Sequence, residues 1–228
     1  MVSVLNWEVF ILDLETGKKI FEKIKPLFTD YDVIKNLIPD SILVGSDEHL
    51  HFITLVSLIG YADDLYKVVE AANMTYEDPN TRYLFYPEEV VLVADNDFRK
   101  YAYDMKKYKL VKRVLNDVAH WYELCRVIVS EHDGKLLGLF IDSEYDAHVI
   151  YQKLKNDKWE YTKGHFLPKY MVLGDDKIYP MWFILLKSCG IPLRNLEKVP
   201  MPITDEIIRL FNITGITESS DSAVVSEL

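Results

Sequence analysis

Apolar residues recur at three- and four-residue spacing along most of this 228-residue chain, and this periodicity restricts the fold more than any other feature. One apolar stripe runs from Ile20 to Phe28, and another runs from Leu65 to Ala72. Runs of strictly alternating polar and apolar residues, which would indicate strands, are sparse. The sequence therefore predicts an all-α fold.

Capping residues mark several helix boundaries in the first half of the chain. Ser46 stands directly before two acids, a pattern typical of a helix start, and Gly60 is expected to end that apolar helix. The stretch 77–80 has the composition of a turn. Pro87, followed by two glutamates, predicts another helix start.

The second half of the chain contains the longest helical pattern, which runs from about residue 110 to 131 with Leu115 among its inward positions. We expect Ser143 to cap the helix that follows it. A later helix is expected to begin at Lys177 or just before, because Pro180 is tolerated only in a first turn, and to stop at Gly190.

Composition limits the classes of protein that the chain can belong to. Hydrophobic residues make up 49% and charged residues 27%, as in ordinary globular proteins. Two cysteines are too few for a disulfide framework or a four-cysteine iron–sulfur cluster, and no metal-binding or nucleotide-binding motif occurs. We therefore expect no metal and no cofactor. No apolar run approaches the roughly 20 residues of a membrane span, and the first residues lack signal-peptide features, so a cytoplasmic location is expected.

Charge is distributed unevenly along the chain. The net charge is −10, yet the segment 99–113 holds seven basic residues and one acid, a local charge of +6. Such a segment, interleaved with tyrosines, could follow a nucleic-acid backbone. It could equally be an amphipathic helix with a solvated basic face, which is the interpretation we favour. The candidate DNA-binding residues in this segment are Arg99, Lys106, Lys107 and Lys109.

The segment 165–215 carries the most functional information. An apolar corner, Val172-Leu173-Gly174, is followed by Lys177 and an apolar helix, and a Pro-x-Pro turn at 200–202 then leads to Asp205. Here the chain resembles the helix-hairpin-helix DNA glycosylase superfamily, in particular archaeal-type members. The segments 45–61 and 75–85 are similar to parts of the same group.

The resemblance implies one helix-hairpin-helix glycosylase-like domain over 1–216, built as two helical subdomains around a cleft, with the hairpin region at about 165–190. A disordered acidic tail is expected at 217–228. The implied function is base-excision repair of double-stranded DNA, with lyase activity as a further expectation. Lys177 would be the nucleophile and Asp205 the assisting acid, because an amine can attack the sugar and a carboxylate stabilises developing positive charge. The implied DNA-binding residues of this region are Lys169, Leu173 and Gly174.

A flipped base needs an apolar or aromatic pocket. The aromatic residues available for it are Trp121, Trp159, Trp182, Tyr83 and Phe85.

The chain departs from the family pattern at two points. The corner lacks the second glycine of the usual hairpin and has Asp175 and Asp176 where backbone amides would meet a phosphate. Thr204 stands where a gapless alignment would place the aspartate. Two alternatives therefore stay open: a catalytically degenerate relative that binds DNA or a protein without chemistry, and a helical interaction module unrelated to DNA.

Overall fold

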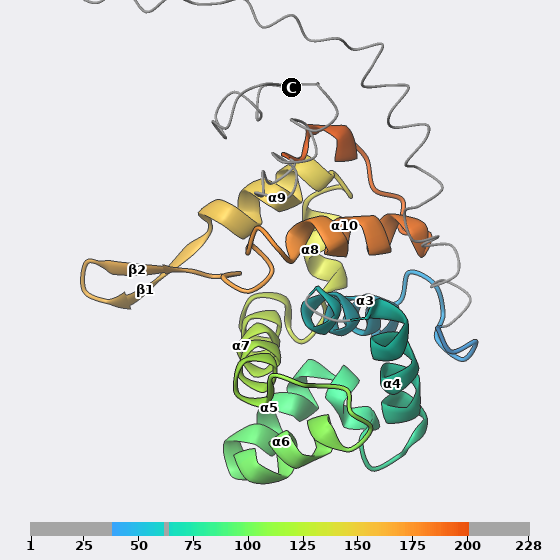
Figure 1. Cartoon of the computed structure of the whole chain (residues 1–228). Helices are drawn as coiled ribbons and strands as arrows, with labels where there is room; N and C mark the ends of the chain where they lie inside the picture. Colours follow the sequence, from blue (N-terminus) through green and yellow to red (C-terminus); the bar gives the residue numbers. More distant parts are fainter. Residues whose placement is uncertain (1–37, 62–63, 201–228) are drawn as a thin grey trace, which may run out of the picture. The chain divides into compact units, whose positions relative to one another are not determined.

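The computed structural model describes residues 38–61 and 64–200. These residues fold mainly into helices, with two short strands, so the all-α prediction is confirmed at the level of a mostly helical chain (Figure 1). The described residues belong to one compact unit, which spans 31–200. The stripe from Ile20 to Phe28, Asp205 and the predicted tail at 217–228 lie outside the described residues.

Helix α3 (Asp47–Gly60) is the centre of the described unit. Ser46 caps it as predicted, because the Ser46 hydroxyl accepts the His49 N–H at 3.2 Å. Every residue from His49 to Gly60 is buried. The helix packs against α10 on one side and α4 on another (Figure 1). A helix that is apolar on all sides is stable only when neighbours cover it completely.

A group of helices follows α3 in the chain, and α5 packs against both α6 and α7 within it. Trp121 of α7 is completely buried there, and its indole N–H donates to the Leu84 carbonyl at 2.8 Å. The elements of this group are α4 (Leu65–Glu77), η2 (Arg82–Phe85), α5 (Pro87–Asn96), α6 (Phe98–Lys106) and α7 (Val114–His132).

The rest of the unit combines helices with a β-hairpin that projects from them (Figure 1). The two strands are antiparallel and pair Trp159 with Leu167 and Glu160 with Phe166. Gly164, with φ +81°, supplies the positive φ of the hairpin turn. The hairpin was not predicted from the sequence. The elements are α8 (Leu137–Asp142), α9 (Ala147–Asn156), β1 (Lys158–Thr162), β2 (His165–Pro168), α10 (Tyr179–Ser188) and η3 (Leu196–Lys198).

The start of α7 differs from the prediction. The helix begins at Val114 and not near residue 110, because the backbone of Arg113 (φ −90°, ψ 68°) lies outside the helical region. Leu115, predicted to point inward, is 86% exposed. The end of the helix is as predicted, with Asp133 and Gly134 both at positive φ.

The caps of α9 and α10 also differ from the prediction. Asp146, and not Ser143, caps α9, since its carboxylate accepts two backbone N–H groups of the first turn at 2.9 and 3.1 Å. Helix α10 begins at Tyr179 and not at Lys177. The Lys177 N–H instead donates to the Asp175 side chain at 2.8 Å, which keeps the preceding residues in a turn. Gly190, with φ +89°, follows the helix as predicted.

Candidate functional site

The turn from 169 to 178 connects β2 to α10 and carries the predicted nucleophile. The Gly174 N–H donates to the Tyr170 carbonyl at 2.7 Å, and the Asp175 N–H donates to the Val172 carbonyl at 3.2 Å. These amides are therefore used inside the turn, which argues against their binding a phosphate. Leu173 is completely buried and offers no side-chain surface to DNA.

Gly174 is required by close packing. A Cβ atom at this position would lie 2.8 Å from the carbonyl oxygen of Leu154 and 3.1 Å from that of Tyr170. Both obstacles are backbone atoms, so a side chain could be accommodated only by moving α9 or the turn itself. Gly174, which marks a hairpin in the sequence, therefore allows the turn to pack closely against the end of α9.

Lys155 of α9 reaches across to this turn. Its ammonium donates to the Gly174 carbonyl at 2.7 Å and pairs with the Asp176 carboxylate at 2.5 Å. The ring centroids of Tyr179 and Tyr151 lie 5.1 and 5.9 Å from the ammonium, within the range of cation–π attraction. The sequence did not single out Lys155, since the contact joins residues 21 positions apart.

Lys177 itself is exposed. Neither neighbouring carboxylate pairs with its ammonium: Asp175 accepts the Lys177 backbone N–H, and Asp176 binds Lys155. Within the described part of the chain the Lys177 ammonium has no ion-pair partner. Asp205, its predicted partner, lies outside the described residues.

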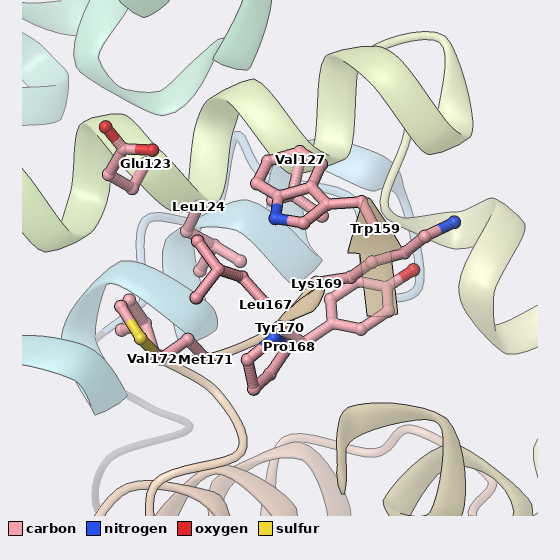
Figure 2. Close-up of a pocket in the computed structure, with 10 residues that line it drawn as sticks. All are labelled: Glu123, Leu124, Val127, Trp159, Leu167, Pro168, Lys169, Tyr170, Met171 and Val172. Atoms are coloured by element: carbon pink, nitrogen blue, oxygen red, sulfur yellow. The ribbon is translucent and has the colours of Figure 1, made fainter. Parts of the chain in front are cut away.

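A small apolar cavity lies between α7 and the segment 167–172 (Figure 2). Its volume is about 130 Å³, below the range of roughly 300 Å³ and above that is usual for ligand pockets. Lys169 lies in its wall, where its ammonium pairs with Glu131. Tyr170 also lines it, and its hydroxyl lies 2.6 Å from Nε2 of His132. Lys177 does not line this cavity, so the two features form separate sites.

Of the five aromatic residues considered for a base pocket, Trp159 lines this cavity. Trp121, Trp182 and Phe85 have no exposed surface, and Tyr83 is 8% exposed. The Trp182 indole N–H donates to the Thr54 hydroxyl at 2.9 Å inside the core. These four side chains stabilise the fold and are not available to a base in this conformation.

A second cavity, of about 390 Å³, lies where the first turns of α3 and α5 meet the loop 133–135. Glu48 accepts hydrogen bonds there from the hydroxyls of Tyr76, at 2.8 Å, and Tyr86. One cation, Lys135, faces five carboxylates, so the cavity would repel phosphate. The carboxylates belong to Asp47, Glu48, Glu88, Glu89 and Asp133.

His51 forms part of the wall of this acidic cavity. Its Nε2 atom lies 3.4 Å from the Leu136 N–H, and its Nδ1 atom lies 3.1 Å from the Phe85 carbonyl. Burial lowers the pKa of His51 to about 4, although Asp47 and Glu48 act in the opposite direction. The ring is therefore a neutral structural group at neutral pH.

The basic segment 99–113 does not form one continuous helix. Its first part belongs to α6, which buries Tyr101, Asp104 and Met105 and exposes its basic side chains, as expected for an amphipathic helix. Lys107 pairs with Asp78. The remaining candidates for binding DNA, Arg99, Lys106 and Lys109, are exposed.

None of the described helices is both long and apolar enough to cross a bilayer. Within 38–61 and 64–200, no three His, Cys, Asp or Glu side chains are grouped as metal ligands. Comparison with models of known protein families gives no match, and neither curated proteins nor solved structures match the chain.

Proposed function

We propose that the chain is a DNA glycosylase with lyase activity and that Lys177 is its nucleophile. The observation that carries this proposal is the exposed Lys177 ammonium, which has no ion-pair partner among the described residues although two acids precede it. The resemblance of the segment 165–215 to helix-hairpin-helix glycosylases supports the same residue. The exposed cations of α6 and the segment after it are the proposed contacts to the DNA backbone.

The proposed chemistry begins with the neutral amine of Lys177. Its nitrogen attacks C1′ of the damaged nucleotide, the N-glycosidic bond breaks, and the base leaves with the bonding electron pair and gains a proton. The sugar ring opens to a Schiff base, and loss of a C2′ proton expels the 3′-phosphate. Water then hydrolyses the imine and restores the amine. In this scheme Asp205 takes the proton from the Lys177 ammonium before attack.

Borohydride trapping tests the proposal directly. Duplex DNA with an abasic site, and a panel of duplexes with oxidised, alkylated or deaminated bases, are incubated with the full chain and sodium borohydride. We expect a covalent adduct that Lys177→Ala abolishes. Lys163→Ala, which removes an exposed lysine from the hairpin turn, is the matched control and should retain the adduct at saturating DNA. No adduct and no released base across the panel would reject the proposal.

A second candidate function is that of a catalytically degenerate relative that binds DNA or a protein partner without chemistry. Phe166, Leu167 and Met171 are 57%, 44% and 61% exposed and lie close together in the sequence beside the small apolar cavity. Exposed apolar patches of this kind mark interaction surfaces. Salt-dependent duplex binding that survives both Lys177→Ala and Asp205→Ala, without turnover by any form, would favour a non-enzymatic role.

A further inference from the structure

One face of α6 carries a tyrosine between two cations. Arg99, Tyr103 and Lys106 follow one another at spacings of four and three residues, which places them in one row along the helix. The opposite face buries Tyr101 and Met105, and α6 packs against α5 and α7 (Figure 1). The row is therefore the outward side of the helix.

The Tyr103 side chain has no packing role in the fold. It is 70% exposed, and among the described residues its ring has no aromatic, cation–π or hydrogen-bond partner. Both flat faces of the ring are consequently free to contact another molecule.

The positive charge beside Tyr103 is not neutralised by the nearby acids. Asp104 pairs with Lys100 at 2.6 Å, and Asp78 pairs with Lys107. Asp97 accepts the Lys100 backbone N–H as the cap of α6. Three exposed cations of this region have no ion-pair partner within the described part of the chain: Arg99, Lys106 and Lys109. The row thus presents positive charge to solvent although the whole chain carries −10.

We propose that this row binds single-stranded DNA, with the Tyr103 ring stacked on an unpaired base and Arg99 and Lys106 bound to phosphates. Cations that follow the backbone, combined with an exposed aromatic ring, are the features by which proteins bind unpaired strands. The row is about 10 Å long, a length over which a stacked strand carries about three phosphates. The inference rests on the proposed contact of α6 with DNA and names an unpaired strand as its partner.

Two other partners fit the row less well. A duplex would satisfy the cations, but it covers the faces of its bases and leaves nothing for the Tyr103 ring to stack on. A membrane-binding helix inserts its apolar face into the lipid, whereas α6 turns that face toward the protein core. A single exposed ring is a small surface for insertion, so we assign the row to an unpaired strand.

Fluorescence anisotropy with an undamaged, labelled oligonucleotide of about 12 nucleotides tests the stacking contact. The full chain is titrated against the single strand and against the same strand annealed to its complement. Tyr103→Leu, which keeps an apolar side chain but removes the flat ring, should weaken single-strand binding by at least about fivefold, and Tyr103→Trp should retain it. Duplex binding should be unchanged by both. Tyr66→Leu, which removes a tyrosine of α4 that is 39% exposed, is the matched control and should bind as the wild type.

The salt dependence of binding tests the two cations. Arg99→Gln combined with Lys106→Gln should reduce the slope of log affinity against log salt concentration by about 1.4, because each phosphate contact to a single strand contributes about 0.7. Lys158→Gln combined with Lys198→Gln removes two exposed lysines from β1 and η3 and should leave the slope unchanged.

No binding of the single strand, equal affinity for single strand and duplex, or a single-strand affinity that Tyr103→Leu leaves unchanged would overturn the inference. Displacement of the oligonucleotide by vesicles that contain phosphatidylserine, with equal vesicle binding by wild type and Tyr103→Leu, would assign the row to a membrane and would overturn it as well. The oligonucleotide contains no damaged base. Failure of borohydride trapping would therefore count against the proposed catalysis, and not against strand binding by α6.

Discussion

Replacement of His51 by glutamine should change how the stability of the protein depends on pH. In the folded protein the Leu136 N–H contacts Nε2, which leaves Nδ1 to donate its proton to the Phe85 carbonyl. Both ring nitrogens are thus engaged in the neutral form. A second proton would remove the acceptor for Leu136 and would place a charge on a side chain that is 3% exposed.

The magnitude follows from the two pKa values of His51. The ordinary value is 6.5 and the folded value is about 4. Between these values the unfolded chain binds a proton that the folded chain does not, so acid favours unfolding. The contribution of the neutral His51 ring to stability is fully present above pH 6.5 and is lost as the pH falls toward 4. As the pH falls from about 7.5 to about 5, protonation of His51 in the unfolded chain lowers the free energy of unfolding by about 2 kcal/mol. Below pH 4 this loss approaches about 3 kcal/mol.

Urea denaturation of the wild-type chain and of His51→Gln at both pH values measures the difference. Other groups also titrate in this range, so the informative quantity is the loss of unfolding free energy in the wild type minus that in the variant. We expect this difference between wild type and variant to be about 2 kcal/mol. His165→Gln, which removes an exposed imidazole from β2, should lose as much stability as the wild type. Equal losses for wild type and His51→Gln would show that the buried ring does not control acid stability.

Three further predictions concern packing and capping. Gly174→Ala should lower the free energy of unfolding by about 1–3 kcal/mol, measured by urea denaturation, because the new Cβ atom meets the carbonyl oxygen of Leu154; an unchanged midpoint would show that the turn moves freely. Asp146→Ala should cost about 1–2 kcal/mol through loss of the α9 cap, with the largest drop in hydrogen-exchange protection in the first turn of that helix, and uniform protection would contradict this. Leu124→Ala should cost about 2–5 kcal/mol and Leu115→Ala less than about 0.5 kcal/mol by the same denaturation assay, since they are 2% and 86% exposed; a reversed order would contradict the α7 register.

Helix boundaries with a local chemical signal were predicted correctly. Ser46 caps α3, Pro87 begins α5, and Gly190 follows α10. Each signal acts through backbone geometry or hydrogen bonds within a few residues, so it can be recognised without knowing the rest of the fold. The sequence predicts Ser143 as the cap of α9, because Asp146 three residues later completes an approximate capping box. Packing selected Asp146, whose other carboxylate oxygen accepts from Asn195.

Features that depend on distant residues were not predicted. The β-hairpin has strands of five and four residues, too short for alternation to stand out in a helical chain. The acidic cavity requires the first turns of α3 and α5, about 40 residues apart, to converge. Lys155 of α9 pairs with Asp176 in the turn before α10, and the β-hairpin separates the two residues in the chain. The sequence predicts Lys177 as a candidate nucleophile, but it does not predict the ion pair that Asp176 in the same turn forms with Lys155.

The complete burial of α3 has a consequence for dissecting the molecule. A peptide that ends or begins in the segment between Gly60 and Leu65 would separate this helix from one set of its neighbours and expose an apolar face to water. Fragments cut there should aggregate and should not fold independently. We therefore expect the helices on either side of α3 to unfold as one cooperative unit, so that their separate contributions to function have to be studied by point substitution in the intact polypeptide.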